Sequence, residues 1–470
     1  MRRIYLEFDI GRQVPPTVLM KLREPPTSGL FQFECTGLEP EFAALRSAGM
    51  NPTAVSAAGQ ILFEHLNKHE SIRAELARAL GIDRSESFPI YVDVSNIEAK
   101  ALPWEALFSP DREFLALDPR WPVGRIIPGR RPVSPPWTLD RPLRVAAILS
   151  CLGVPAMDEY LALVEGLNKV RGTYELRLFI SENELWSEIE PDLPPSVSLF
   201  KVPQDHGELR ERIREFRPHV LHLFCHGSAV GTPHLEVAVS SDWSNPDEGS
   251  RHRLETREIA DLIDVPLCLP WLVVLNACES AVTLDPGPGS GSIAESLVHE
   301  WSVPAVIGMR ESVLGANAAR FTRQFYASLA ATLAPALSGP VRSLHIDWAG
   351  LVVAAREELC RKPTAGPVSV VAGGAKEWTL PAVHVLPHMF HLNVGDPPPS
   401  RQPQLEAAVV EMLLAAVGDS MPLATLRDFL RHRDERLAET LTEPHGRRAP
   451  ARSEPDGRLA ERHTEPDDGR

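Results

Sequence analysis

The first 128 residues combine strand-like and helix-like patterns of apolar positions. Alternating or short apolar runs predict strands over residues 2–9, 30–37 and 88–95. Residues 40–80 repeat apolar positions at helical spacing, with a break expected at Asn51-Pro52. The pattern therefore predicts a small α/β subdomain over residues 1–128.

From residue 143 the pattern changes to strands that alternate with helices. The predicted strands cover residues 143–150, 174–180, 197–202, 219–225, 271–276 and 303–308. The predicted helices cover residues 157–170, 206–216, 256–264, 291–301, 315–334 and 342–361. Several of these strands are apolar without alternation, which is typical of strands covered by helices on both faces. The pattern over residues 143–395 therefore predicts an open, mostly parallel sheet with helices on both faces.

Three further segments complete the chain. Residues 129–142 are rich in proline and lack an apolar period, so we interpret them as a linker. Residues 403–440 predict a pair of amphipathic helices, which either dock a partner or pack as the last helices of the domain. Residues 441–470 hold charged near-repeats such as SEPDGR. They cannot bury enough surface to offset the entropy of ordering, so we expect a disordered tail.

Composition narrows the class of protein. The 470 residues are 43% hydrophobic, enough for a packed core, and the formal net charge of −15 argues against a general nucleic-acid binder. No apolar run reaches the roughly 18 residues of a membrane span, and the first residues do not read as a signal peptide. The six cysteines form no C-x-x-C pair, so neither a zinc ribbon nor a disulfide framework is predicted and a reducing cytoplasm is expected.

Two predicted strands end in reactive side chains. The segment LHLFCHGSAV, residues 221–230, runs apolar up to His226. The segment WLVVLNACES, residues 271–280, runs apolar to a turn that contains Cys278. In open α/β sheets the catalytic groups lie beyond the carboxyl ends of the strands. We therefore expect His226 and Cys278 to lie close together in one active site.

A cysteine beside a histidine suits nucleophilic catalysis. The imidazole of His226 can take the thiol proton of Cys278, and the thiolate is the nucleophile. We expect Gly227 to let the backbone turn sharply, and its amide and that of Cys278 to form an oxyanion hole. A lone buried cysteine is usually only a small hydrophobe, so the prediction depends on the pairing. Nearby His222 and Cys225 are interpreted as core residues, and no metal site is predicted.

Other catalytic motifs are missing from the sequence. The glycine-rich segment at residues 285–292 lacks the Lys-Ser/Thr of a phosphate-binding loop, and we interpret it as a mobile loop after the nucleophile. No G-x-S-x-G is present, and no G-x-G-x-x-G follows a strand. A serine hydrolase and a nucleotide-binding protein are therefore disfavoured, and no cofactor is expected.

These segments resemble a known family. LHLFCHG and VVLNACESA, followed by GSIAESLVHEWSVPAVIGMR, closely resemble the CHAT domain, and LPWEAL at residues 102–107 is similar to a motif found early in that domain. CHAT domains are caspase-like cysteine peptidases of the caspase and separase clan. The resemblance, over residues 85–390, implies a caspase-haemoglobinase fold and a Cys-His dyad. Cys278 would be the nucleophile and His226 the general base, without a third acidic residue.

The chain departs from the family in one segment. CHAT domains often read IGTQWPV after the later strand, whereas this chain reads IGMRESV at residues 307–313. In this clan the segment helps to shape the pocket for the side chain before the scissile bond. Arg310 would favour an acidic substrate side chain, whereas Glu311 or Asp285 would favour a basic one. The alternative interpretation is that all three are solvated surface charges. The sequence leaves open which of these interpretations holds.

The resemblance also implies partners. CHAT proteases are often effectors of bacterial defence and cell-death systems that a partner protein activates. The expected substrate is a protein made in the same cell, such as a gasdermin-like or another co-encoded protein, with no direct nucleic-acid or membrane partner. The alternative is a non-enzymatic scaffold or latent pseudo-protease that acts by binding.

Overall fold

The structure is a computed structural model. It describes residues 3–11, 17–24, 26, 31–33, 54–81, 86–95, 97–130, 137–170, 173–243, 250–263, 269–282, 291–339, 341–361 and 375–395. The chain divides into two compact units, Met1–Asp396 and Pro397–Arg470, and all described residues belong to the first. The helical pair predicted at residues 403–440 and the tail predicted at residues 441–470 lie outside the described residues.

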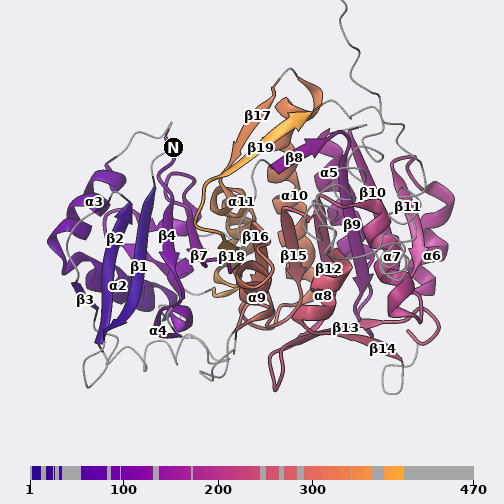
Figure 1. Cartoon of the computed structure of the whole chain (residues 1–470), viewed down its shortest axis with the longest axis horizontal. Helices are drawn as coiled ribbons and strands as arrows, with labels where there is room; N and C mark the ends of the chain where they lie inside the picture. Colours follow the sequence, from indigo (N-terminus) through magenta and orange to yellow (C-terminus); the bar gives the residue numbers. More distant parts are fainter. Residues whose placement is uncertain are drawn as a thin grey trace, which may run out of the picture. The chain divides into compact units, whose positions relative to one another are not determined.

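One large sheet runs through the described unit (Figure 1). Its first half contains parallel strands in the spatial order β11 (Val197–Lys201), β10 (Tyr174–Ile180), β9 (Leu143–Ser150), β12 (Val220–Ser228), β15 (Leu272–Asn276) and β16 (Ala305–Met309). Its second half continues with β18 (Pro381–Val385), β7 (Val123–Ile126), β4 (Ile90–Asp93), β1 (Ile4–Gly11), β2 (Thr17–Glu24) and β3 (Phe31–Phe33). The strands of the predicted subdomain at residues 1–128 thus continue the sheet of residues 143–395.

The two halves of the sheet run in opposite directions. Strand β18 pairs antiparallel with β16, and β7, β4 and β1 follow β18 in parallel order. The carboxyl ends of β12 and β15 therefore lie at the edge where β18 begins. Strand β15 is buried along its whole length and β9 along nearly all of it, which confirms the mostly parallel, helix-covered sheet predicted from the apolar runs.

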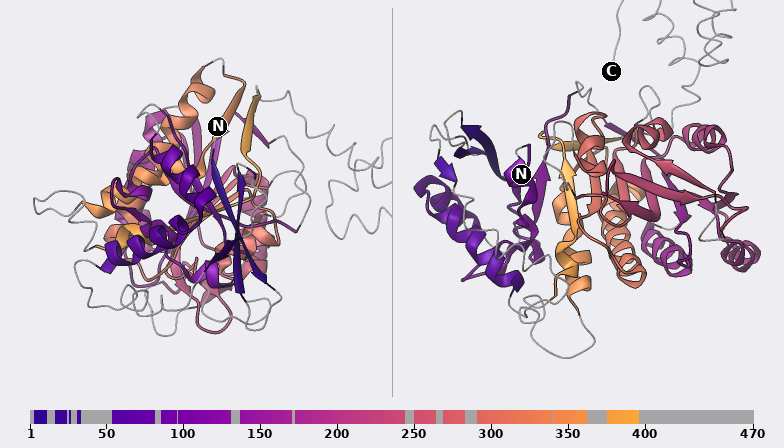
Figure 2. Two further views of the ribbon diagram at one scale, coloured as in Figure 1. Left: turned by 90° about the vertical axis from the view of Figure 1, so that its left-hand side faces the viewer. Right: turned by 90° about the horizontal axis from the view of Figure 1, so that it is seen from below.

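Helices cover both faces of this sheet (Figure 2). In one layer α10 (Gly315–Ser338) contacts α5 (Met157–Leu167) and α11 (Trp348–Cys360), and in the other α8 (Thr256–Ile263) contacts α7 (His206–Phe216) and α9 (Ile293–His299). The other α-helices among the described residues are α2 (Ala54–Asn67), α3 (Glu70–Leu80), α4 (Ile97–Ala101) and α6 (Asn183–Ile189). Within the described ranges, no helix has the length and apolar character to span a bilayer.

Several elements differ from the sequence prediction. The helix predicted over residues 342–361 is wrong in its first turn, because β17 (Ser343–Ile346) forms there and pairs with β19 (Phe390–Gly395). Strand β8 (Trp137–Asp140) lies inside the predicted linker and pairs with β19. Strands β13 (His234–Ala238) and β14 (Arg251–Leu254) form an unpredicted hairpin that extends β12. Strands β8 and β17 depend on a partner far along the chain, which a local pattern does not reveal, whereas β13 and β14 pair with segments nearby in the sequence.

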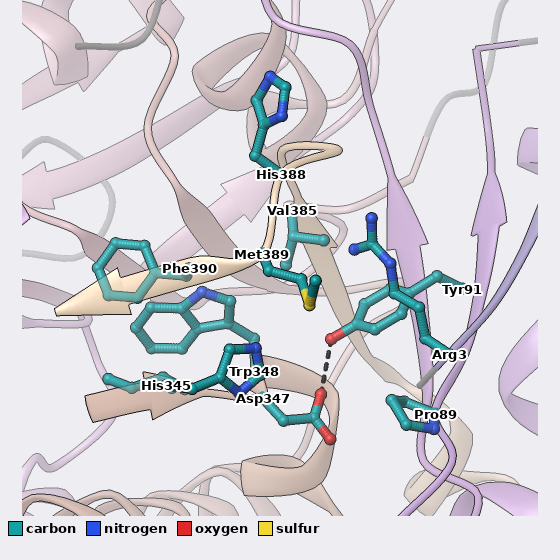
Figure 3. A pocket seen from close by; sticks show the side chains of 11 residues that line it. Arg3, Pro89, Tyr91, His345, Asp347, Trp348, Val385, His388, Met389 and Phe390 are labelled. Atoms are coloured by element: carbon teal, nitrogen blue, oxygen red, sulfur yellow. Dashed lines mark hydrogen bonds between the residues drawn. The ribbon is translucent and has the colours of Figure 1, made fainter. Parts of the chain in front are cut away.

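A pocket brings Arg3 and Tyr91 close to Asp347, just before α11, and to His388 after β18 (Figure 3). Because the end of β18 pairs with the start of β16, this junction lies at the edge of the sheet where β16 begins. The hydroxyl of Tyr91, a residue of β4, donates a hydrogen bond to Oδ1 of Asp347 at 2.7 Å. Arg3, the residue directly before β1, donates a hydrogen bond to the Pro387 carbonyl oxygen at 2.5 Å. Burial, together with the negative charge of Asp347, raises the pKa of Tyr91 well above its ordinary value. The phenol therefore stays protonated and remains a hydrogen-bond donor.

A buried ion cluster joins the halves at the other edge of the sheet. Glu105, in the short 3-10 helix Trp104–Ala106 of the LPWEAL segment, is fully buried and accepts two hydrogen bonds from Arg125 of β7, at 2.8 and 2.7 Å. Arg310, just after β16, approaches the same carboxylate at 3.4 Å. Burial alone would raise the pKa of Glu105, but the charge and hydrogen bonds of Arg125 lower it to about 2.

We predict that Glu105→Gln lowers the free energy of unfolding by about 3–5 kcal/mol, because it leaves the buried Arg125 without its counter-charge. The carboxylate stabilises the native state fully above its ordinary pKa of 4.5, and this contribution is lost as pH falls toward 2. Urea unfolding between pH 7 and pH 3 should therefore show a weaker acid dependence in the variant. The matched control is Glu165→Gln, a 65% exposed carboxylate paired with Arg323, which should cost less than about 1 kcal/mol. Equal losses in the two variants would contradict a dominant role for the buried cluster.

Candidate active site

The sheet brings His226 and Cys278 to the same edge. Strands β12 and β15 are parallel neighbours, and Phe224 and Asn276 form their last aligned pair (Figure 1). His226 lies two residues beyond Phe224, and Cys278 lies two residues beyond Asn276. Both side chains are half-buried. The two predicted catalytic residues therefore extend from adjacent strands at matching heights.

Direct backbone contact joins these two strand ends at Gly227. A Cβ atom on Gly227 would lie 2.1 Å from the carbonyl oxygen of Cys278, closer than any side chain tolerates. The expected sharp turn at Gly227 is wrong, because β12 continues to Ser228 and pairs Gly227 with Leu235 of β13. The glycine is required for close approach of two backbones rather than for a turn.

The ring of His226 is oriented by a backbone carbonyl. Its Nε2 lies 2.6 Å from the carbonyl oxygen of Leu152, in the segment that follows β9. A carbonyl oxygen only accepts, so Nε2 carries the proton and donates it. In a neutral imidazole this leaves Nδ1 as the nitrogen that can take a proton from a thiol. Sequence reasoning missed Leu152, because a backbone carbonyl has no side-chain signature.

The sulfur of Cys278 lies against the segment after β16. The backbone N–H of Val313 donates to Sγ at 3.4 Å, and Sγ lies 3.9 Å from the Val313 carbonyl. A donor directed at sulfur stabilises negative charge that develops there. The backbone amide of Cys278 has no acceptor within the described part of the chain, and the oxyanion-hole role of this amide and that of Gly227 stays a prediction.

The other described cysteines are poor nucleophiles. Cys151, Cys225 and Cys360 are buried, whereas Cys278 is half-buried. Burial raises the pKa of Cys151 to about 12, with smaller contributions from Cys278 and Glu159. Burial likewise raises the pKa of Cys225 well above its ordinary value, so both thiols stay protonated. Cys225 is thus a core residue, as predicted.

A buried network of polar side chains joins the strand end before Cys278 to two helices. The side-chain amide of Asn276 donates to Glu159 Oε1 of α5 at 2.9 Å and to Thr322 Oγ1 of α10 at 3.0 Å. His222 is fully buried, with Nε2 3.0 Å from the same Glu159 oxygen, in agreement with its predicted place in the core. Asn276 therefore anchors the turn of Cys278 to two helices. Its position in the NACES segment was visible in the sequence, but its distant partners were not.

Glu279 connects the turn of Cys278 to the loop after His226. Its Oε2 accepts a hydrogen bond from the Ala229 amide at 3.1 Å, and its own amide lies 3.4 Å from the Glu311 carbonyl. Its φ of 57° is a left-handed conformation that is uncommon for a residue with a side chain. Strain of this kind persists only where surrounding contacts enforce it, and it occurs often at functional sites. Sequence reasoning assigned no role to Glu279.

The residues predicted to shape the substrate pocket have partners of their own. Arg310 approaches Glu105 at 3.4 Å and donates to the Ala101 carbonyl at 3.2 Å. Glu311 forms an ion pair with Lys376 at 2.5 Å. Asp285 lies outside the described residues. The preference for an acidic or a basic substrate side chain therefore stays a prediction. The described ranges contain no cluster of side chains suited to a metal ion.

Fold and site together define a caspase-like α/β protein: a mostly parallel sheet between helical layers, with a histidine and a cysteine at adjacent strand ends. The model of the CHAT domain matches residues 56–345, more than half of the chain. The chain therefore belongs to the CHAT domain family, in the caspase-like cysteine peptidase group. No curated protein sequence matches it.

We predict that Gly227→Ala separates the two strand ends, because its Cβ would overlap the Cys278 carbonyl. Iodoacetamide alkylation of Cys278 at neutral pH, followed by peptide mass spectrometry, should slow to the rate seen in His226→Gln. Unfolding should cost about 1–3 kcal/mol less free energy than in the wild type. Gly81→Ala is the matched control, since its Cβ would meet Ala77 at an ordinary 3.4 Å. Wild-type alkylation in Gly227→Ala would contradict the close approach.

We predict that Glu279 acts as a positioning residue through its acceptor oxygen. Glu279→Gln keeps an acceptor for the Ala229 amide and should retain most of the His226-dependent alkylation of Cys278. Glu279→Ala removes the acceptor and should lose several-fold of that rate, about 1 kcal/mol for one hydrogen bond. Equal losses in the two variants would assign the effect to charge, and no loss in either would show that the bond is dispensable.

Proposed function

We propose that the protein is a cysteine endopeptidase that cleaves a protein substrate through Cys278 and His226. The observation that supports this most directly is the orientation of the His226 ring. Its Nε2 is held by Leu152 at 2.6 Å, while its strand end touches the backbone of Cys278 through Gly227. Membership of the caspase-like peptidase group adds support.

The proposed reaction begins with transfer of the thiol proton of Cys278 to Nδ1 of His226. The thiolate attacks the scissile carbonyl carbon, and the resulting oxyanion accepts hydrogen bonds from the amide of Cys278 and, as predicted, that of Gly227. The imidazolium then donates its proton to the departing amine, and the C–N bond breaks to leave a thioester. Water, deprotonated by His226, attacks the thioester and releases the acid product with the free thiol.

We further propose a regulated role in a bacterial defence or cell-death system in the cytoplasm. The support is the family alone. The substrate would be a protein of the same cell, such as a gasdermin-like or another co-encoded protein. A partner protein would activate the enzyme.

Co-expression with the proteins encoded beside its gene tests the proposed activity. We expect a partner to be cut by the wild type and by Cys360→Ala, a matched change at a buried thiol on α11. Cys278→Ala and His226→Ala should lower the cleavage rate about a thousandfold or more, because nucleophile and base act as a unit. Intact mass spectrometry of the partners gives both the cleavage and its position.

A second readout does not depend on knowing the substrate. Alkylation of Cys278 at neutral pH should be several-fold slower in His226→Gln, whereas the buried Cys151 and Cys225 should react slowly in both proteins. Partners that stay whole but co-purify with wild type and Cys278→Ala alike, together with His226-independent alkylation, would instead support the binding scaffold.

A further inference from the structure

Two large apolar side chains are exposed beside the candidate active site. Val230 is 73% exposed and Leu314 is 72% exposed, more than the other exposed large apolar residues of the described chain, Leu161 at 49% and Met389 at 41%. A single exposed aliphatic residue is ordinary on a protein surface. These two are unusual because of what their sequence neighbours contact.

Both residues adjoin the turn of Cys278. Val230 directly follows Ala229, whose amide donates to Glu279 at 3.1 Å. Its own amide donates to Ser228 Oγ at 3.2 Å, so its loop has a defined conformation. Leu314 directly follows Val313, whose amide donates to the sulfur of Cys278 at 3.4 Å. The loops that present Val230 and Leu314 therefore both contact the segment Cys278–Glu279.

Leu314 also departs from what its local structure favours. It is the N-cap residue of α10, where Ser, Thr, Asp or Asn would accept a hydrogen bond from the helix, and its side chain makes no such bond. Its carbonyl accepts from the amides of Asn317 and Ala318, both at 2.9 Å, so the backbone is held by the helix. An exposed leucine at a capping position breaks a local rule, and such departures occur often at functional sites.

The two described charged side chains that were predicted to shape the pocket already have partners. Arg310 approaches Glu105, and Glu311 is paired with Lys376. A substrate charge would have to compete with these ion pairs. By contrast, the apolar surface of Val230 and Leu314 faces water, and its removal from water is favourable.

We propose that Val230 and Leu314 are specificity-determining residues that receive large apolar side chains of the protein substrate close to the scissile bond. This inference rests on the proposed peptidase activity and names the class of its substrate. A substrate segment with aliphatic or aromatic residues at the bond would cover both side chains. Loss of either contact should lower the selectivity for such a segment about tenfold or more.

The test uses peptidyl acyloxymethyl ketones, which label a nucleophilic cysteine by displacement of a carboxylate. The set carries Leu, Ser, Asp or Lys at one of the two residues nearest the ketone and is otherwise identical. Rates of Cys278 labelling in the full chain are measured by mass spectrometry and divided by the iodoacetamide rate of the same protein. We expect the Leu probes to label at least about tenfold faster than the Asp and Lys probes.

Variants assign this preference to the two residues. Leu314→Ser and Val230→Thr should each reduce the Leu preference at one of the two probe positions. Leu161→Ser, an exposed leucine on α5, is the matched control and should keep the wild-type preference. A faster Asp or Lys probe, or an unchanged Leu preference in both variants, would overturn the inference while leaving the peptidase intact. Labelling no faster in the wild type than in His226→Gln would overturn the peptidase and this inference together.

Discussion

The close approach of Gly227 to the carbonyl of Cys278 is the constraint on which the site depends. Two parallel strands normally keep their backbones about 4.8 Å apart, and their ends are free to diverge. Here the turn after β15 bends over the end of β12 until only a hydrogen atom fits between them. The relative position of the two strand ends, from which the imidazole and the thiol extend, is therefore set by backbone contact. Leu152, Val313 and Glu279 then contact His226, Cys278 and Ala229, which lie at strand ends that are already held together.

The antiparallel junction between β16 and β18 places the first part of the chain beside this site. Because β18 begins where β16 ends, the LPWEAL segment reaches the active-site edge, and Glu105 meets Arg310 there. A fully buried carboxylate requires compensating charge, and Arg125 supplies most of it. Arg310 is thereby held at the start of the segment whose next residues contact Glu279 and Cys278. The first part of the sheet thus stabilises one wall of the site.

Sequence reasoning predicted the parts of this arrangement that depend on local pattern. Apolar runs marked β9, β12 and β15, and the rule that catalytic groups follow parallel strands was enough to expect His226 and Cys278 at adjacent strand ends. The contacts that orient the pair were not predictable, since Leu152 acts through a backbone carbonyl and Glu279 through a left-handed turn. The strand β17 was taken for the start of a helix, because its pairing with β19 joins segments more than forty residues apart. Local pattern also could not show that Arg310 and Glu311 already have partners.

Asn276, the last residue of β15, and Ser280 hold the turn in place on either side of Cys278. Asn276 is bound to α5 and α10, and the Ser280 hydroxyl donates to the Ala277 carbonyl at 2.9 Å while accepting from the Met309 amide at 2.9 Å. Both side chains are buried, so the turn is attached on either side of Cys278 to the sheet and its helices. Cys278 itself is half-buried, in contrast to Cys151 and Cys225, which are buried and whose pKa values burial raises. Among the described cysteines at this edge, Cys278 is therefore the one that the surrounding structure both holds in place and leaves partly exposed to solvent.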